Sequence, residues 1–410
     1  MSRIVNNIFT FTIINGLNKA IPFLLLPIIV KLLDKNELGL LAAFQSYYDL
    51  VIILVGTSSG IFIQQKYFKV SKNELISYVS NLYAYHIFSS IFFILNIYIF
   101  KSMLVNLFQV NVSVIYWGVI MAILFQGINI TYSYLQMQRR TVTYGLFIIV
   151  QTIINLTISL LMLHLGHGWI SRVYGISVAL TVSYLGTYMY MYYHKHTSPS
   201  MISQERIKEI FSKSISFFPT ELIGWGKRNI NKLLILSVIG ASALGEYYLA
   251  LTIASIISLL VSSIVQGLRP YLLADLSKNR YRKITKYVSI VISFSILLVI
   301  LMTLAKPTMT HYIFSSKLTM EYPLYIGILL MVSLEPLIKL LLTILLYFEK
   351  NGRISKLALI TNSVFIVTSF PLLKLYGIFG LVINSIVLSL VIITAYSIEI
   401  NKEIIARKLS

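Results

Sequence analysis

The sequence predicts an all-α polytopic membrane protein of about twelve transmembrane helices. Hydrophobic residues make up 57% of the 410 residues and charged residues only 12%, which is about half the charged fraction of a typical soluble protein. One core cannot enclose that much apolar surface, so lipid must cover the remainder. The apolar residues gather in stretches of roughly 20, the length that crosses a membrane as a helix. Strands of a β-barrel would be about half as long and would alternate in polarity.

Twelve stretches of the chain have this length and character, and short polar segments separate them. They are 9–31, 41–61, 78–100, 114–134, 142–163, 173–193, 215–238, 247–268, 287–305, 324–347, 357–373 and 377–397. The first is too long for a cleaved signal peptide and no small-residue cleavage site follows it, so we expect it to be the first span.

The basic residues favour one orientation in the membrane. With the N-terminus inside, 22 of the 34 Lys and Arg residues fall in cytoplasmic segments and 7 in external ones. Cytoplasmic loops carry such an excess, so we expect both termini to be cytoplasmic. The same bias, rather than nucleic-acid binding, explains the net charge of +20. The absence of cysteine from the sequence excludes disulfide and thiolate chemistry.

The spans divide into two sets of six around a polar midpoint. We expect an N-terminal six-helix lobe (1–196), a cytoplasmic linker with an amphipathic helix (197–214), a C-terminal six-helix lobe (215–397) and a cytoplasmic tail (398–410). An even number of spans gives both lobes the same orientation, so a repeat axis would run along the membrane normal. Three matches support a repeat: Leu38-Gly39 with Leu244-Gly245, Arg140 with Arg353, and Gly168 with Gly377.

Motifs for catalysis and nucleotide binding are missing from the sequence, so we expect neither an enzyme nor a cofactor. It contains no G-x-x-x-x-G-K-[ST] phosphate loop and no H-E-x-x-H pair. His194 and His196 lie in a polar segment without Cys or acidic ligands nearby, which favours a solvated loop over a metal site.

Ionisable residues inside the spans are the strongest functional candidates, because each costs a few kcal/mol at the bilayer centre. There are eight: Lys19, Asp49, Glu221, Lys227, Arg228, Lys232, Glu335 and Lys339. Five are cationic and three are acidic. They predict a hydrated central cavity between the lobes with a cationic wall, which suits a phosphate-bearing substrate.

The span 215–238 is the richest in these residues. At about 100° per residue, Glu221, Trp225, Arg228 and Lys232 share one face, and Lys227 points away from it. Such a stripe cannot face lipid, so it lines a wet cavity or a partner helix. The alternative is that Glu221 pairs internally and Lys232 extends to the outer surface.

Other spans add polar side chains that have two possible roles. Their amides can line a path for a sugar, or they can hydrogen-bond between neighbouring helices. Glu335 and Lys339 lie one helical turn apart, a spacing that also suits an internal salt bridge. The polar and aromatic residues assigned to the cavity wall are Asn15, Asn18, Gln126, Asn129 and Trp225.

Two stretches resemble signatures of polysaccharide transporters. Residues 21–39 read IPFLLLPIIVKLLDKNELG, a Pro-containing helix that runs into a short basic-Leu-Leu outer loop ending in Leu-Gly. Residues 231–248 read NKLLILSVIGASALGEYY and are similar to the seventh-span signature, with Asn231-Lys232 in place of the usual Asp-Arg pair. With twelve spans in two lobes, the chain resembles the Wzx-type O-antigen flippases of the multidrug/oligosaccharidyl-lipid/polysaccharide superfamily.

The resemblance implies a flippase of the bacterial inner membrane. Its substrate would be an undecaprenyl-diphosphate-linked O-antigen repeat unit, moved from the inner to the outer leaflet by alternating access and coupled to an H⁺ or Na⁺ gradient. Membrane lipid and the O-antigen polymerase machinery are the other implied partners, and nucleic acid is not one.

Roles for the membrane-embedded charges follow from this substrate. Lys19, Arg228 and Lys232 are predicted to attract the diphosphate, with Lys339 and then Lys227 carrying less weight. Ion coupling needs a titratable or chelating group in the membrane. The candidates, in order, are Asp49, Glu335 and Glu221.

Two other functions stay open. A cation-coupled multidrug exporter of the same superfamily would need an acidic cavity, and five cations against three acids argue against it. A membrane O-antigen polymerase or glycosyltransferase usually needs a large outer loop, whereas the longest outer segment here, 306–323, has about 18 residues.

Overall fold

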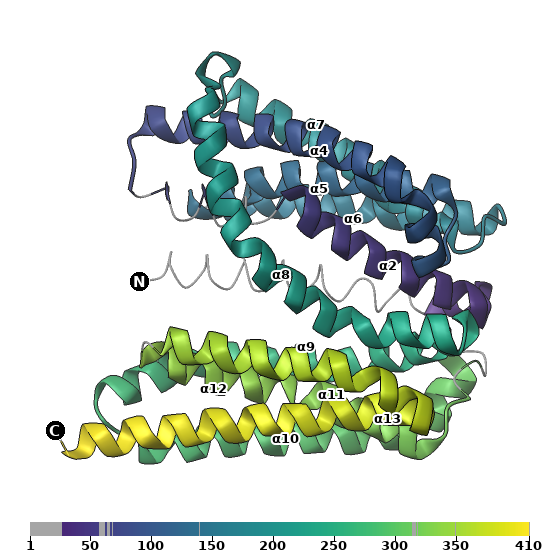
Figure 1. Cartoon of the computed structure of the whole chain (residues 1–410), viewed down its shortest axis with the longest axis vertical. Helices are drawn as coiled ribbons and strands as arrows, with labels where there is room; N and C mark the ends of the chain where they lie inside the picture. The colour runs from purple at the N-terminus through teal and green to yellow at the C-terminus, as the bar shows by residue number, and fades with distance from the viewer. Residues whose placement is uncertain are drawn as a thin grey trace. The chain divides into compact units, whose positions relative to one another are not determined.

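Helices form all the regular secondary structure in the part of the chain that the structure describes. The computed structural model describes residues 27–409 apart from 57–61, 64, 65, 68, 139, 314–316, 318 and 349. The helices, shown in Figure 1, are α2 (Lys35–Gly56), α4 (Lys72–Phe108), α5 (Val112–Met137), α6 (Thr141–His164), α7 (Ile170–Tyr193), η1 (Pro199–Met201), α8 (Gln204–Val238), α9 (Ala241–Ser277), α10 (Arg282–Thr308), η2 (Met309–Ile313), α11 (Tyr322–Ser333), α12 (Glu335–Tyr347) and α13 (Asn351–Leu409).

The predicted all-α membrane fold is confirmed. By length and composition, eight helical stretches of the described residues could cross a membrane, and they include α2, α4, α5, α6 and α9. The last of the eight, 352–407, holds two predicted spans, because Gly377 leaves the helical conformation within α13 (φ 60°, ψ −150°). Helices α7 and α8 occupy two more predicted spans. Most of the predicted span 9–31 lies outside the described residues. The helices therefore agree with a plan of about twelve spans.

The chain forms two compact units, Met1–Trp225 and Gly226–Ser410. The division falls inside α8, so the early part of this helix packs with the first unit and its end with the second. The predicted lobe, linker and tail boundaries stay predictions.

In the first unit, α5 packs against α2, α4 and α7, and α6 packs against α7. Tyr47 of α2 is fully buried, and its hydroxyl donates to the Ile115 carbonyl at 2.8 Å. A β-carbon at Gly118 would lie 2.6 Å from the Tyr47 ring, and one at Gly127 would collide with the ring of Tyr184. Glycines on α5 thus let aromatic side chains of neighbouring helices approach its backbone, a frequent packing device of membrane helices.

In the second unit, α9 packs against α10, α11 and α12, and α13 packs against α11 and α12. Tyr247 of α9 and Tyr325 of α11 are buried in this core. Asn384 is also buried, and its amide donates to Ser369 Oγ at 3.1 Å within α13. A buried amide is tolerated here because its polar atoms find partners.

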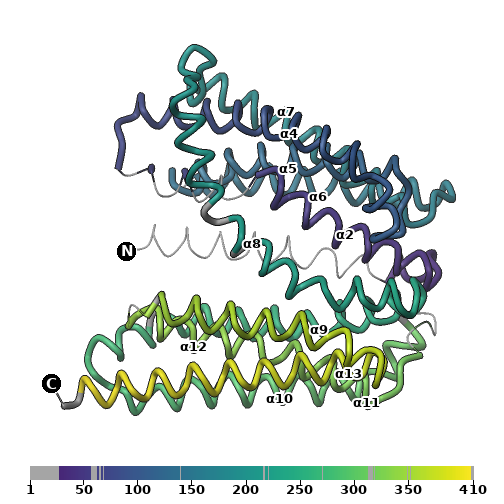
Figure 2. Tube along the Cα trace, viewed as in Figure 1, coloured from purple at the N-terminus to yellow at the C-terminus, as the bar shows by residue number. Residues whose placement is uncertain are grey.

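The segment between α7 and α8 is fixed to α4. Figure 2 shows the chain turning back at this point. Ser198 N–H donates to Ser80 Oγ at 2.8 Å. Asn81, fully buried, donates from Nδ2 to the Met201 carbonyl at 2.9 Å and accepts from Ser203 N–H at 2.8 Å. These hydrogen bonds satisfy linker backbone groups that would otherwise need water.

Two expectations about this segment differ from the structure. The amphipathic residues 204–211 form the first turns of α8 rather than a separate helix, because no breaker precedes Pro219 and the helix continues through it. His196 is only 8% exposed rather than solvated, and Tyr134 Oη lies 3.0 Å from its Nδ1.

Candidate functional site

The site residues of the first unit lie on α2, α5 and α8. Asp49 on α2 and Glu221 on α8 are both half-buried. Trp225 Nε1 donates to the Ser46 carbonyl at 2.9 Å, which fixes α8 against α2. Ser46 precedes Asp49 by about one turn on the same face of α2. The structure therefore brings Trp225 to the face of α2 that carries the first-ranked coupling candidate.

Gln126 joins α5 to α2. Its side chain is 6% exposed, and Nε2 donates to the Ile52 carbonyl at 2.9 Å. A β-carbon at Gly56 would lie 2.6 Å from the Gln126 amide carbon and 2.7 Å from the His86 ring, so α2 approaches closely here. This arrangement matches the alternative use of such amides, to connect helices. Asn129, one turn further along α5, is half-buried.

In the second unit, Glu335 meets side chains from two other helices. Ser258 Oγ of α9 donates to Glu335 Oε2 at 3.3 Å. Lys227 of α8 is half-buried and interacts electrostatically with Glu335. Glu335 begins α12 and is followed by Pro336, so its carboxylate lies at the positive end of that helix. Glu335 is itself exposed, and a cation, a hydroxyl and a helix N-terminus together favour its charged form.

Lys339 lies one turn beyond Glu335 and is exposed. The ion pairs of the described residues do not include one between these two side chains. The carboxylate interacts instead with Lys227, which the sequence gave the least weight among the five cations. A helical projection shows the faces of one helix but not which neighbour each face meets.

The other cations of α8 differ in environment. Arg228 is exposed, whereas Lys232 is half-buried and its Nζ donates to Asn229 Oδ1 at 3.2 Å. Asn229 itself is fully buried. Sequence reasoning missed Asn229, although an amide next to a run of charges in an apolar span was a visible signal.

Asn231 is a second polar residue of α8. In the sequence it was notable only because it replaces the aspartate of the usual Asp-Arg pair. It is 6% exposed, and its Nδ2 donates to Ser385 Oγ of α13 at 3.2 Å. Asn231 thus connects α8 to α13 within the second unit.

Asn15, Asn18 and Lys19 lie outside the described residues. Their assignment to the cavity wall and to diphosphate binding stays a prediction. The roles of all the other candidate site residues also stay predictions, because the structure describes their positions and not their functions.

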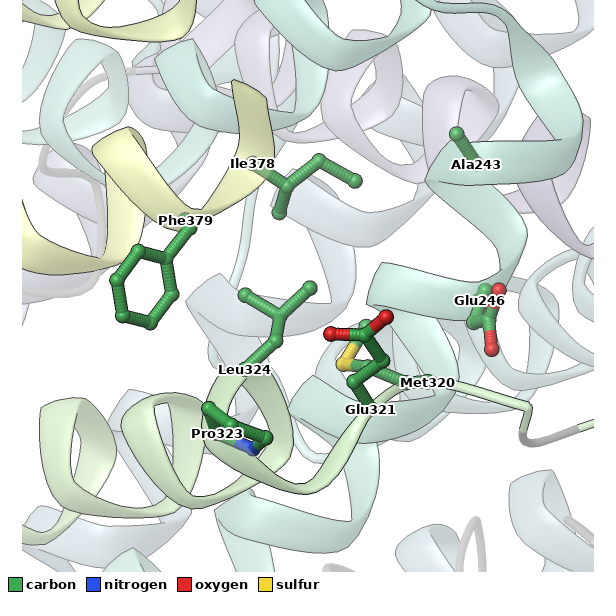
Figure 3. Close-up of a pocket in the computed structure, with 8 residues that line it drawn as sticks. All are labelled: Ala243, Glu246, Met320, Glu321, Pro323, Leu324, Ile378 and Phe379. Atoms are coloured by element: carbon green, nitrogen blue, oxygen red, sulfur yellow. The ribbon is translucent and has the colours of Figure 1, made fainter. Parts of the chain in front are cut away.

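A pocket of about 340 Å³ opens in the second unit, and none of these candidates lines it (Figure 3). Glu246 of α9 and Glu321 at the start of α11 face it, together with Leu324 and Phe379. Thr319 Oγ1 donates to Glu246 Oε1 at 2.7 Å. The pocket lies at helix ends that the sequence assigns to the outer side of the membrane.

Residues 4–274 match the family described as "Polysaccharide biosynthesis protein". The chain belongs to this family. Among curated proteins it is 22% identical over 264 residues to an "Uncharacterized membrane protein" of Haemophilus influenzae. The matched region is 64% of this chain and 63% of that protein. The chain thus matches a little under two thirds of the length of that relative.

Solved transporters share the fold of this family member. A structure described as the lipid II flippase MurJ in an inward closed conformation has a TM-score of 0.75 at 12% identity, covering 95% of this chain and 87% of that one. An inward-facing multidrug resistance MATE family transporter of the MOP superfamily has a TM-score of 0.70 at 12% identity, covering 94% and 95%. The chain is therefore a multi-pass membrane protein with the fold of these transporters.

Proposed function

We propose that the protein is a flippase for a lipid-linked oligosaccharide. Its substrate is an undecaprenyl-diphosphate-linked O-antigen repeat unit, which it moves from the inner to the outer leaflet of the bacterial inner membrane. The family match over residues 4–274 carries this proposal, because it connects a chain made mostly of membrane helices with polysaccharide biosynthesis. The fold shared with a lipid II flippase supports it.

The membrane-embedded cations serve the diphosphate in this mechanism. Two or more negative charges cannot cross a dry bilayer, because an ion transferred from water to hydrocarbon loses its solvation. Arg228, Lys232 and Lys19 lower that barrier from the wall of a hydrated cavity, and Lys339 and Lys227 contribute less. The exposure of Arg228 and the half-exposure of Lys232 are compatible with this role.

Coupling to a gradient of H⁺ or Na⁺ uses a carboxylate inside the membrane. Asp49, Glu335 and Glu221 remain the candidates in that order. The electrostatic interaction of Glu335 with Lys227 supports a simple form of coupling. Protonation of Glu335 would remove the negative charge that stabilises Lys227, so proton binding and the charge of the cavity wall would change together.

The proposed flippase works by alternating access between its two lobes. Both termini lie in the cytoplasm, and the protein associates with the O-antigen polymerase machinery that uses its product.

A multidrug exporter is the second candidate, supported by the fold shared with the multidrug transporter. Such a protein would make cells tolerant of lipophilic cations. Loss of that tolerance in a deletion strain with unchanged surface polysaccharide would favour the exporter.

The deciding experiment is a deletion strain assayed for surface polysaccharide and for the leaflet that holds its lipid-linked repeat units. We expect surface polysaccharide to disappear while repeat units accumulate on the inner leaflet. Units that accumulate on the outer leaflet would instead indicate a polymerase. Normal surface polysaccharide would contradict the flippase.

Complementation then tests the cationic wall. Arg228→Ala should restore little surface polysaccharide, and Arg228→Lys should restore part of it, because charge matters more here than a bidentate geometry. Lys408→Ala, in the predicted cytoplasmic tail, is the matched control and should complement fully. Normal export by well-expressed Arg228→Ala and Lys19→Ala proteins would contradict the cationic cavity.

A further inference from the structure

The carboxylate of Glu209, in the first turns of α8, is surrounded by donors from three chain segments. Lys213 Nζ lies 2.6 Å from Oε1, and Lys66 Nζ lies 3.4 Å from the same oxygen. An Arg206 guanidinium nitrogen lies 3.5 Å from Oε2. The Tyr78 hydroxyl lies 3.1 and 3.0 Å from the two oxygens. We call these five residues the Glu209 cluster. Three cations and a phenol converge on one anion.

Aromatic rings hold the cations of the Glu209 cluster in place. Tyr78 is 2% exposed, and its ring centroid lies 4.2 Å from the Arg206 guanidinium and 4.7 Å from Lys66 Nζ. The buried ring of Phe62 lies 5.3 Å from Lys213 Nζ. Contacts of this kind attract a cation to a ring face. The three cations therefore have anchors of their own besides Glu209.

The charge balance of the cluster is positive. Three cations face Glu209, and a second carboxylate, Glu74, lies 3.8 Å from Arg206. Burial raises the pKa of Glu209, but hydrogen bonds from Lys213 and Tyr78 and the charges of Lys213 and Lys66 lower it to about 2. The site thus binds an anion firmly, and a singly charged carboxylate leaves part of its positive charge uncompensated.

We propose that the Glu209 cluster is a capture site for a phosphate group carried on a lipid, and that Glu209 occupies the site until that phosphate displaces it. A diphosphate offers more charge and more acceptor oxygens than a carboxylate, and Lys and Arg both bind phosphate well. The choice of a lipid diphosphate as ligand rests on the proposed function.

The position of the cluster suits this ligand. Residues 66 and 206–213 lie in segments that the basic-residue bias places at the cytoplasmic ends of predicted spans. The headgroup of an inner-leaflet lipid lies at the same depth. The side chains are also accessible, since Lys213 is 46% and Arg206 28% exposed.

Binding of farnesyl diphosphate to the purified full-length protein in phosphatidylcholine nanodiscs tests the site by calorimetry. Lys66→Gln and Lys213→Gln should each weaken binding about tenfold, because each loses a charge-assisted contact with phosphate. Glu209→Gln should tighten binding about tenfold, because the competing anion is gone. Lys208→Gln, an exposed lysine of α8 that lies outside the cluster, is the control and should bind like the wild type.

Equal affinity of all four variants and the wild type would overturn the proposal. If Glu209→Gln does not fold, the two lysine variants measured against Lys208→Gln decide the outcome alone. Nanodiscs that contain phosphatidylglycerol identify the source of the phosphate. If this lipid displaces farnesyl diphosphate, the site exists and its ligand is a phospholipid headgroup. If it does not, the site exists and its ligand is the lipid diphosphate.

The binding assay and the export assay together test the capture site separately from the proposed flippase function on which it rests. If the variants bind alike but the deletion strain loses surface polysaccharide, the capture site fails and the flippase stands. If the lysine variants bind weakly but the deletion strain keeps its polysaccharide, the site stands and the flippase fails.

Discussion

The two units use different chemistry at corresponding positions. In the first unit, an Arg140 guanidinium nitrogen donates to the Tyr190 hydroxyl at 2.5 Å, which connects the start of α6 to the end of α7. In the second, Arg353 at the start of α13 pairs with Glu399 near its end. Glu399 lies 209 residues after Tyr190. The same helix ends are therefore joined by an arginine in both units, to a phenol in one and a carboxylate in the other.

The middle of α6 and α7 and the matching part of α13 also differ in how they make contact. A β-carbon at Gly175 would lie 2.8 Å from the Asn155 carbonyl oxygen, so the backbones of α6 and α7 approach closely. Asn384, 209 residues after Gly175, lies in the second unit and accepts from Thr368 Oγ1 at 3.0 Å. A close backbone contact in one unit is replaced by a side-chain hydrogen bond in the other.

A glycine with positive φ, in contrast, occurs in both units. Gly168 has φ 56° and precedes the last predicted span of its unit, and Gly377 has φ 60° and begins the last predicted span of the other. Only glycine adopts this left-handed region without strain. At the positions that the predicted repeat matches, the positive φ of the glycine is shared, whereas the contacts between helices differ.

The largest expected effect is at the middle contact. Gly175→Leu should destabilise the protein by about 3 kcal/mol, because the added atoms collide with the Asn155 carbonyl oxygen as well as with the Ser159 side chain of α6. Asn384→Ala should cost about 1–2 kcal/mol, the value of a lost buried hydrogen bond. Thermal unfolding in detergent measures both. A smaller loss for Gly175→Leu than for Asn384→Ala would contradict the close approach of α6 and α7.

The two left-handed glycines should differ in a way that a second substitution reveals. Gly168→Ala and Gly377→Ala should each cost about 1–2 kcal/mol for the strained backbone. A β-carbon at Gly168 would also meet the carboxylate of Glu37, whereas nothing lies within 4 Å at Gly377. Glu37→Ala should therefore recover part of the loss in Gly168→Ala and none in Gly377→Ala. Equal recovery in both backgrounds would show that the collision does not matter.

Salt should separate the two arginines. Arg353→Ala should cost no more than about 1 kcal/mol, as expected for an exposed ion pair. That cost should shrink between about 0.05 and 1 M NaCl, because salt screens exposed charges. Arg140→Ala removes a hydrogen bond to a neutral phenol, so its cost should change less. The measurement is the melting temperature of each variant at the two salt concentrations, and an equal salt response would remove the distinction.

Acid should weaken only the first unit through His196, and this effect is the smallest. Burial, His194 and the nearby charges of Arg140 and Lys72 lower the pKa of His196 to about 4. The unfolded chain, with an ordinary pKa of about 6.5, takes up this proton first. Stability is therefore complete above about pH 6.5 and falls towards pH 4.

Histidine-selective NMR of the six histidines measures this titration directly. His196→Gln identifies the resonance and should remove its share of the acid sensitivity. A His196 resonance that titrates near 6.5 would contradict the burial.

The sequence predicted the helical membrane fold because span length and composition follow from lipid thickness alone. Contacts between helices were harder to predict. The spacing of Glu335 and Lys339 suited a salt bridge, but α12 begins at Glu335, which turns that carboxylate towards Ser258 and Lys227. The Glu209 cluster was missed because Lys66 and Tyr78 lie far along the chain from residues 206–213 and only the fold brings them together.

Hydropathy did not show how far one helix extends. The charges at 204–211 predicted a short amphipathic helix on the inner membrane surface. In the structure the same residues begin α8. A change in polarity along a sequence indicates where a membrane ends, but a helix ends only where its backbone hydrogen bonds do.

The hydrogen bonds between Asn81 and the linker have a consequence for the order of synthesis. Every partner of Asn81 in that contact precedes residue 204. The contact can therefore form while most of α8 is still inside the ribosome. Domains generally fold as units, beginning with the N-terminal one during translation. The first unit ends at Trp225, so a nascent chain carries all of its residues before α9 has been translated. The first half can then be folded and inserted while the second is still being made.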